Sequence, residues 1–145
     1  FSEELIVPLA EVLGKLGAKR ALVVHGEGNL DEFTVTGKTS VADYKDGKVS
    51  TYQITPEQFG LPRASLSDLE GGSDAVVSAE LMKEILNGET GARRDMVLLN
   101  AGAALMASGA ATDIGEGIVL AADCIDSGKA IHTLESLISY SRNCG

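Results

Sequence analysis

The chain has 145 residues, 44% of them hydrophobic and 23% charged, and a formal net charge of −9. These values are typical of a soluble globular domain with a sizeable core. The negative balance argues against nucleic-acid binding, which needs clustered Lys and Arg, and no apolar run approaches the roughly 20 residues that span a bilayer.

The first elements in the chain indicate an α/β arrangement. Apolar residues at helical spacing predict a helix over residues 5–16, with Pro8 in its first turn and Gly17 as its stop. The short apolar run over residues 21–24 is typical of a strand buried on both faces, as in a parallel sheet. A helix followed by such a strand predicts helices layered on a sheet.

Residues 39–54 are predicted to form a β-hairpin. The Asp-Gly pair at 46–47 is a strong two-residue turn signal between the two strands. Side-chain alternation places Tyr52 and Ile54 on one face and Val49 on the other, so the register stays open.

The rest of the chain is predicted to be mainly helical. A short turn with Thr55 as N-cap ends near Gly60, and residues 61–73 are expected to form a loop. Apolar stripes then predict helices over residues 75–86, from Met96 to Met106, from Ile114 to Ile125 after an Asp113–Glu116 capping box, and beyond the Ser127-Gly128 break. Asn100 interrupts the second apolar stripe and is expected to bond to backbone or a polar neighbour.

Together these elements predict an α/β fold with a partial mixed sheet. The sheet is expected to contain a buried parallel strand and the β-hairpin, covered by a carboxy-terminal helical layer. No repeat, linker or low-complexity tract divides residues 1–145, so a single domain is expected. The first residues lack Met and the features of a signal peptide, which suggests a start inside a longer protein.

The cysteines and the basic pairs offer no further site. Cys124 is predicted to be a core thiol and Cys144 lies beside the chain end, so no disulfide framework is expected and a reducing cytoplasm is the default location. The basic pairs at 19–20 and 93–94 are predicted to be solvated surface.

The loop after the first strand is the candidate functional site. Ligands in open α/β sheets bind at the carboxyl ends of strands, where residues 25–32 lie. Gly26 and Gly28 allow a sharp turn and close backbone approach, and Asp31 and Glu32 follow with adjacent carboxylates. Mg²⁺ often takes one or two carboxylates plus substrate phosphates. The alternative interpretation is an ordinary surface acidic pair beside turn glycines.

The two histidines are weaker candidates. His25 ends the apolar strand and is interpreted as a structural histidine more readily than as a base, while His132 is predicted to lie on the surface. The loop lacks the third glycine of a dinucleotide fingerprint, and a hairpin follows it instead of a helix.

The strand and loop carry a family resemblance. Val23-Val24-His25-Gly26 followed by Leu30-Asp31-Glu32 resembles the HG-x-DGLDE signature of anthranilate phosphoribosyltransferases. In the family's order and approximate spacing, the similarity continues through Pro56-Glu57-Gln58-Phe59-Gly60-Leu61, Leu98-Leu99-Asn100-Ala101, Gly115-Glu116-Gly117 and Asp126-Ser127-Gly128-Lys129-Ala130. The chain departs from the family at Gly28-Asn29, where Asp-Gly is usual, and at Ser78, where Asn is common. Asn also tolerates a left-handed turn, so the loop is expected to close.

The resemblance implies an α/β domain like those of nucleoside phosphorylases and phosphoribosyltransferases. It implies that Asp31 and Glu32 hold Mg²⁺ against the diphosphate of phosphoribosyl pyrophosphate while phosphoribose passes to the amine of anthranilate, a step of tryptophan biosynthesis. It assigns no catalytic base, nucleophile or further substrate-binding residue to this chain.

The resemblance also implies that much of the family's enzyme lies outside this sequence. The family's GTGGD loop is not present, nor is the amino-terminal helical domain that supplies anthranilate contacts and the homodimer interface. The chain is therefore expected to be a carboxy-terminal portion that is inert alone. Two alternatives stay open, a pyrimidine nucleoside phosphorylase of the same architecture and a non-catalytic binding module that kept the fold.

Overall fold

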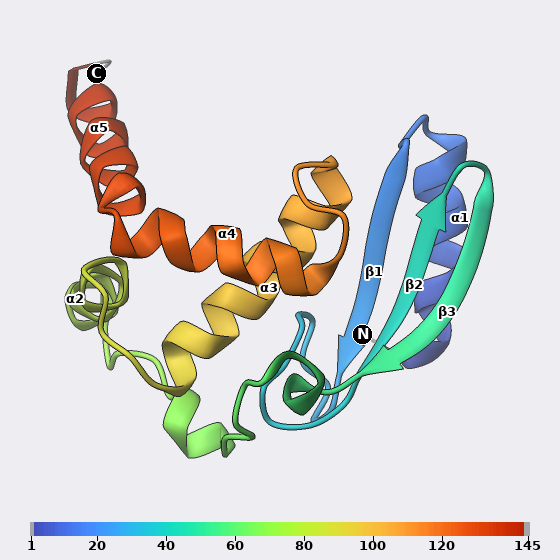
Figure 1. The fold of residues 1–145 in the computed structure, drawn as a ribbon, viewed down its shortest axis with the longest axis horizontal. Helices are drawn as coiled ribbons and strands as arrows, with labels where there is room; N and C mark the ends of the chain where they lie inside the picture. Colours follow the sequence, from blue (N-terminus) through green and yellow to red (C-terminus); the bar gives the residue numbers. More distant parts are fainter. Residues whose placement is uncertain (1, 144–145) are drawn as a thin grey trace.

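The computed structural model of the chain describes residues 2–143, which form a three-stranded sheet with helices on both faces (Figure 1). The strands are β1 (Arg20–Gly26), β2 (Thr39–Lys45) and β3 (Lys48–Ile54). The helices are α1 (Ile6–Lys15), α2 (Ala75–Leu86), α3 (Ala92–Ser108), α4 (Ile114–Asp126) and α5 (Lys129–Asn143), with short 3₁₀ turns η1 (Glu3–Leu5), η2 (Pro56–Phe59) and η3 (Leu66–Leu69). The predicted α/β class, hairpin and carboxy-terminal helices are confirmed.

The sheet is antiparallel in the order β1-β2-β3, which differs from the prediction for the first strand. β1 pairs with β2 from Arg20 opposite Lys45 to Gly26 opposite Thr39. Within residues 2–143 its other edge has no strand beside it, and its side chains before Gly26 are half-buried. The prediction of a fully buried strand in parallel pairing is therefore wrong for the part of the chain that the structure describes. β1 is apolar because each of its faces packs on a different hydrophobic cluster.

The hairpin forms as the Asp-Gly pair predicts. Asp46 and Gly47 both have positive φ, 50° and 81°, as a type I′ turn requires. The register pairs Val41 with Tyr52 and Tyr44 with Val49, so the two faces that the sequence left open are now assigned. The face with Tyr52 is turned to the helical layer, and the face with Val49 is turned to α1.

The core lies on both sides of the sheet. On one side α1 buries Ile6 and Ala10 against Ala42 of β2. On the other side α3 and α4 pack on the sheet through a larger cluster, whose buried members are Phe33, Val35, Val41, Ile54, Leu98, Leu99, Ala103, Met106, Ile114, Ile118, Ala121 and Ile125. This larger cluster also encloses the loop that follows β1, so it sets the position of the candidate site.

Helices α3 and α4 approach each other closely at a pair of glycines. A Cβ added to Gly117 would meet the backbone carbonyl of Gly102, and one added to Gly102 would lie 2.8 Å from the backbone nitrogen of Ile118. Both glycines are buried within their helices. Their missing side chains let the two backbones come into direct contact.

The caps of the late helices agree largely with the sequence. Asp113 caps α4 by accepting from the Glu116 amide at 2.9 Å. The Glu116 carboxylate reaches back to the Thr112 amide at 2.7 Å, one residue earlier than a capping box would place it. Asp74 caps α2 by accepting from the Val76 and Val77 amides at 2.9 and 3.0 Å, a cap that the sequence interpretation missed.

Helices α2 and α5 lie at the end of the molecule away from the sheet (Figure 1). Neither buries a residue within the described chain, although both carry the predicted apolar stripes. Val76 is 68% exposed and Leu137 is 62% exposed. The prediction that the late helices cover the sheet therefore holds for α3 and α4 but not for α2 and α5. None of the helices in residues 2–143 is long and apolar enough to cross a membrane.

Two surface predictions were wrong for reasons of packing. Arg94 is 8% exposed because α3 turns it toward α4, where its Nη2 atom lies 2.8 Å from an Asp126 carboxylate oxygen. Arg20 is largely buried, donating to both carboxylate oxygens of Asp43 and to the Met106 carbonyl near the end of α3. Conversely, Cys124 is exposed on α4 instead of lying in the core, and Cys144 is outside the described residues.

Candidate functional site

A tight turn at the end of β1 presents the acidic pair. Gly26 and Leu30 exchange two backbone hydrogen bonds, 2.8 and 3.2 Å long, around a three-residue turn. Gly28 and Asn29 in that turn both have positive φ, 85° and 64°. Asn29 thus adopts the left-handed conformation expected of it, and the departure from the family's usual Asp-Gly does not prevent closure. Asp31 and Glu32 follow at once, and both are exposed.

Gly26 brings the backbone of the acidic pair onto the strand end. A Cβ at position 26 would lie 2.8 Å from the Glu32 carbonyl oxygen and 3.1 Å from the Leu30 side chain. Its φ is ordinary, so the need for glycine here is one of space and not of backbone strain. The first glycine of the signature therefore acts by allowing close approach.

Asn100 fixes the residue that follows the pair. Its Oδ1 accepts from the Phe33 amide at 3.0 Å, and its Nδ2 donates to the Phe33 carbonyl at 2.8 Å and to the Met96 carbonyl at 3.0 Å. The prediction that Asn100 bonds to backbone is confirmed. Its partner, 67 residues away and next to Glu32, was not predicted, because no local pattern indicates such a contact.

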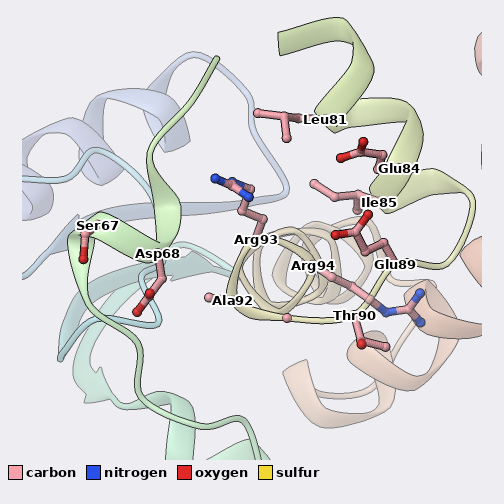
Figure 2. A pocket seen from close by; sticks show the side chains of 11 residues that line it. Ser67, Asp68, Leu81, Glu84, Ile85, Glu89, Thr90, Ala92, Arg93 and Arg94 are labelled. Atoms are coloured by element: carbon pink, nitrogen blue, oxygen red, sulfur yellow. The ribbon is translucent and has the colours of Figure 1, made fainter. Parts of the chain in front are cut away.

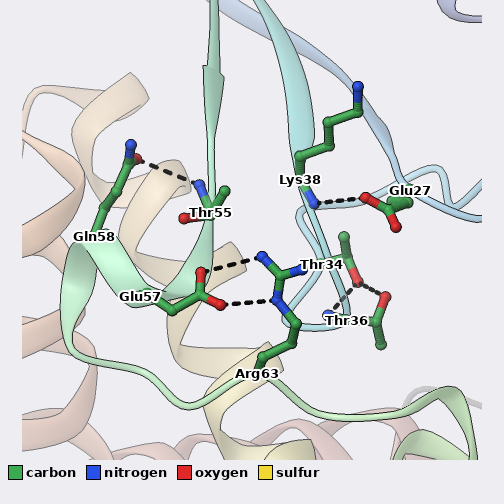
Figure 3. Close-up of polar contacts among 8 residues, drawn as sticks. All are labelled: Glu27, Thr34, Thr36, Lys38, Thr55, Glu57, Gln58 and Arg63. Carbon is green, nitrogen blue, oxygen red and sulfur yellow. Dashed lines mark hydrogen bonds and ion pairs between the residues drawn. The ribbon is translucent and has the colours of Figure 1, made fainter.

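A polar network holds the rest of the loop (Figure 3). The Thr34 amide donates to Thr39 Oγ1 at 3.0 Å, and the Thr36 amide donates to Thr34 Oγ1 at 3.0 Å. The Val35 carbonyl accepts from the Ala64 amide at 3.0 Å, which ties the loop to the segment after η2. Phe33, Thr34 and Val35 are each at most 4% exposed. The acidic pair thus projects from a loop whose next residues are fully anchored.

The electrostatics of the pair favour a cation. Burial raises the pKa of Glu32, and the neighbouring Asp31 carboxylate raises that pKa further. None of the ion pairs within residues 2–143 involves either residue. Two adjacent carboxylates without a positive partner in this part of the chain gain from a divalent cation, which would offset their repulsion.

The donor set fits Mg²⁺ only if other oxygens complete its shell. The described residues contain no group of three or more His, Cys, Asp or Glu placed to hold a metal. Mg²⁺ keeps several waters and commonly uses one or two carboxylates with substrate phosphates, so two carboxylates are enough protein ligands for it. A structural zinc site, in contrast, needs four protein ligands, which this pair does not supply. His132 lies on the surface as predicted, with 82% of its side chain exposed, and His25 lies in β1 opposite Ser40.

An exposed ion pair lies close to the anchored loop (Figure 3). Arg63 Nε donates to the Glu57 carboxylate at 2.8 Å. This hydrogen bond is the main cause that lowers the pKa of Glu57 from 4.5 to about 2, with its backbone and Thr55 contributing less. On the other side, the Glu27 carboxylate accepts from the Lys38 amide at 3.2 Å, and Gly37 leaves room for that side chain.

The Glu57–Arg63 pair gives a test of the local geometry. A carboxyl with a lowered folded pKa stabilises the fold fully above its unfolded pKa of about 4.5 and loses that contribution as the pH falls toward 2. We expect an NMR titration of Glu57 to give a pKa near 2, and Arg63→Gln to return it toward 4.5. Arg93→Gln, which removes a cation bonded to the Glu70 carbonyl instead, should leave it unchanged. A Glu57 pKa near 4.5 in the unaltered chain would contradict the pair.

A second concave region lies at the start of α3, away from the acidic pair (Figure 2). This cavity of about 430 Å³ is lined by residues of η3, α2, the segment between α2 and α3, and the first turn of α3, and by no residue of the loop after β1. Arg93 extends from α3 between η3 and α2, and Arg94 extends to the other side of the helix. Arg93 donates to the Glu70 carbonyl and Arg94 Nη2 donates to Asp126, while Arg94 Nη1 is buried without a hydrogen-bond partner among the described residues. The cavity therefore adds no group to the candidate metal site.

Comparison with known proteins shows which family this chain resembles in sequence and in fold. The chain matches the α/β domain of a glycosyl transferase family over residues 1–131. It is 50% identical over 140 residues to the anthranilate phosphoribosyltransferase of Desulfotalea psychrophila, covering 97% of this chain and 40% of the relative. The match to that of Citrifermentans bemidjiense is also 50%, over 141 residues, with the same shares of the two chains. The chain thus spans about two fifths of the length of these relatives.

Solved structures give the same result. The anthranilate phosphoribosyltransferase of Thermus thermophilus superposes with a TM-score of 0.88 at 40% identity, over 98% of this chain and 41% of that one. The Saccharomyces cerevisiae enzyme in complex with phosphoribosyl pyrophosphate and Mg superposes with a TM-score of 0.79 at 28% identity, over 93% of this chain and 39% of that one. The predicted resemblance is therefore confirmed in sequence and in fold.

Proposed function

Since the chain belongs to the glycosyl transferase family through its α/β domain, we propose that it is the carboxy-terminal part of an anthranilate phosphoribosyltransferase. The observation that carries the proposal is the loop after β1. Asp31 and Glu32 project there from an anchored backbone, in the order and spacing of the family signature that this sequence resembles. The relatives at 50% identity bear that name, and a yeast relative has been solved with Mg bound.

The proposed reaction transfers phosphoribose to an amine. The anthranilate nitrogen forms a bond to the anomeric ribose carbon, the bond from that carbon to the pyrophosphate oxygen breaks with its electron pair leaving on pyrophosphate, and the nitrogen loses a proton. Bound Mg²⁺ would supply Lewis-acid stabilisation of the leaving pyrophosphate. Asp31 and Glu32 are the residues of this chain that would hold it.

The residues around the pair would position it and take no part in the chemistry. Gly26 lets the Glu32 backbone rest on the strand end, and Asn100 fixes Phe33 directly behind the pair. Phosphoribosyl transfer at the anomeric carbon depends strongly on such fixed geometry, since positioning can be worth roughly 7–11 kcal/mol of the barrier. No general base is assigned to the described residues.

The test is an assay of the full-length polypeptide with phosphoribosyl pyrophosphate, anthranilate and Mg²⁺, followed by loss of anthranilate fluorescence. We expect Mg²⁺-dependent turnover from the full-length polypeptide and none from the 145-residue chain. The chain offers one candidate metal-binding carboxylate pair and no glycine-rich phosphate loop of the GTGGD type, and its net charge of −9 opposes binding of a polyanionic donor. Turnover by the short chain at the full-length rate would show that the site is misplaced.

The same assay separates the two alternatives. A pyrimidine nucleoside phosphorylase would cleave a pyrimidine nucleoside with inorganic phosphate and leave anthranilate unchanged. A non-catalytic module would turn over neither substrate pair, although it could still bind the donor in a calorimetric titration. Either result from the full-length polypeptide would overturn the transferase proposal.

A further inference from the structure

We propose that Asn100 is a positioning residue for the reaction, because it transmits the placement of α3 to the carboxylate pair Asp31–Glu32. The inference rests on the proposed function and adds a residue to it. Asn100 lies on α3, outside the loop that carries the pair, and its amide joins α3 to the loop through the Phe33 backbone.

Both ends of the Asn100 amide, its oxygen and its nitrogen, bond to the backbone of the same residue, Phe33. Asn100 accepts from the Phe33 N–H at 3.0 Å and donates to the Phe33 C=O at 2.8 Å. Because the N–H and the C=O of Phe33 belong to two successive peptide groups, these two hydrogen bonds fix both the position and the orientation of the Phe33 backbone. The amide nitrogen of Phe33 belongs to the same peptide unit as the Glu32 carbonyl, so the clamp acts directly on the backbone of the metal pair.

The other end of the same peptide unit is also confined. The Glu32 carbonyl lies where a side chain on Gly26 would fall, 2.8 Å from the added Cβ. The peptide between Glu32 and Phe33 is thus held by the strand end on one side and by α3 on the other. Loss of the Asn100 amide would free one of these two supports while the Glu32 and Asp31 side chains stay intact.

Asn100 itself is held in a single orientation. Its Nδ2 also donates to the Met96 carbonyl one turn earlier on α3, at 3.0 Å. This bond uses the second proton of the amide, so nitrogen and oxygen are not interchangeable in the contact. The Phe33 side chain is 4% exposed within the large cluster, so it is held in the core, while the orientation of the Phe33 peptide groups depends on the Asn100 amide.

If Asn100 only stabilised the fold, its replacement would lower the melting temperature and leave the metal response unchanged. If it positions the pair, its replacement changes how well the pair binds Mg²⁺. Groups that orient metal ligands typically change metal affinity about 10- to 100-fold when they are replaced. The deciding measurements are therefore the Mg²⁺ concentration that gives half-maximal turnover and, independently of turnover, the Mg²⁺ affinity of each variant in a calorimetric titration with pyrophosphate present.

The experiment compares four variants of the full-length polypeptide. Asn100→Leu keeps the approximate size of the side chain and removes both hydrogen bonds to Phe33. Asn100→Ser keeps a polar group but cannot make both bonds, and it serves as the second variant if Asn100→Leu folds poorly. Ile125→Ala, a buried change on α4 in the same cluster, is the control for lost stability. Asp31→Asn with Glu32→Gln reports on the metal site itself.

We expect both Asn100 variants to need about tenfold more Mg²⁺ for half-maximal turnover, measured at a temperature where circular dichroism shows each variant folded. Ile125→Ala should lower the melting temperature and leave the Mg²⁺ requirement unchanged. An unchanged Mg²⁺ requirement in the Asn100 variants would overturn the inference while the Asp31–Glu32 result still supports the metal site. If the Asp31–Glu32 variant also responds to Mg²⁺ as the parent does, the metal site of the proposed function fails and this inference fails with it.

Discussion

Simultaneous replacement of Asp31 by Asn and Glu32 by Gln is expected to lower the Mg²⁺-dependent turnover of the full-length polypeptide by at least about 100-fold. Metal stabilisation of a leaving anion is worth several kcal/mol, and each 1.36 kcal/mol is a factor of about ten in rate. The side chains keep their shape and lose only their charge. Because both are exposed, the fold should be unaffected, and the melting temperature should stay within about 2 °C of the parent.

The matched control removes the same charge elsewhere. Glu80→Gln with Glu84→Gln changes two exposed carboxylates on α2, away from the loop after β1. This control should retain the parent's rate and its response to Mg²⁺. The test is to measure steady-state rates at several Mg²⁺ concentrations. If the double variant at Asp31 and Glu32 keeps the parent's rate and its response to Mg²⁺, these residues do not hold the metal.

Replacement of Gly117 by Ala should destabilise the chain by about 3 kcal/mol or more. Overfilling a tightly packed site usually costs about 1–3 kcal/mol, and here the new methyl would meet the backbone carbonyl of Gly102 and not a side chain that can rotate away. Helices α3 and α4 would have to separate, which would open the cluster that holds Phe33. For a chain of this size the melting temperature should fall by roughly 10 °C.

Gly115→Ala is the matched control on the same helix. A Cβ there would approach a terminal oxygen of the Asp113 side chain at 3.2 Å and the Phe59 ring at 4.0 Å, and no backbone atom within that range. We expect a change below about 1 kcal/mol, since alanine is also the better helix former. Thermal unfolding followed by circular dichroism measures both variants. Equal melting temperatures for the two would show that the helices do not meet at Gly117.

The elements governed by local chemistry could be predicted from the sequence. The Asp46-Gly47 turn defined the hairpin, because few sequences adopt positive φ at two successive residues. The Thr55-Pro56 start and the Gly60 end defined η2 in the same way, with Gly60 at a φ of 72°. The position of the acidic pair at the end of β1 also followed from the sequence, although its metal-binding role stays a prediction.

The features that depend on distant partners could not be predicted. The apolar run of β1 indicated burial but not the direction of its neighbour, and β2 proved antiparallel. Arg94 and Arg20 looked like surface cations because their partners, Asp126 and Asp43, are 32 and 23 residues away. Asn100 was expected to find a backbone partner, yet only the packing of α3 shows that the partner is Phe33.

The span of the Asn100–Phe33 contact has a consequence for how the protein is made. The acidic pair leaves the ribosome well before the helix that fixes it, since Phe33 and Asn100 are separated by 67 residues. At about 5–20 residues per second, translation of that interval takes roughly 3–13 s. During that time a growing chain carries the complete Leu-Asp-Glu segment without the support that shapes it. The geometry of the acidic pair is therefore a late product of synthesis, although its two carboxylates are encoded early.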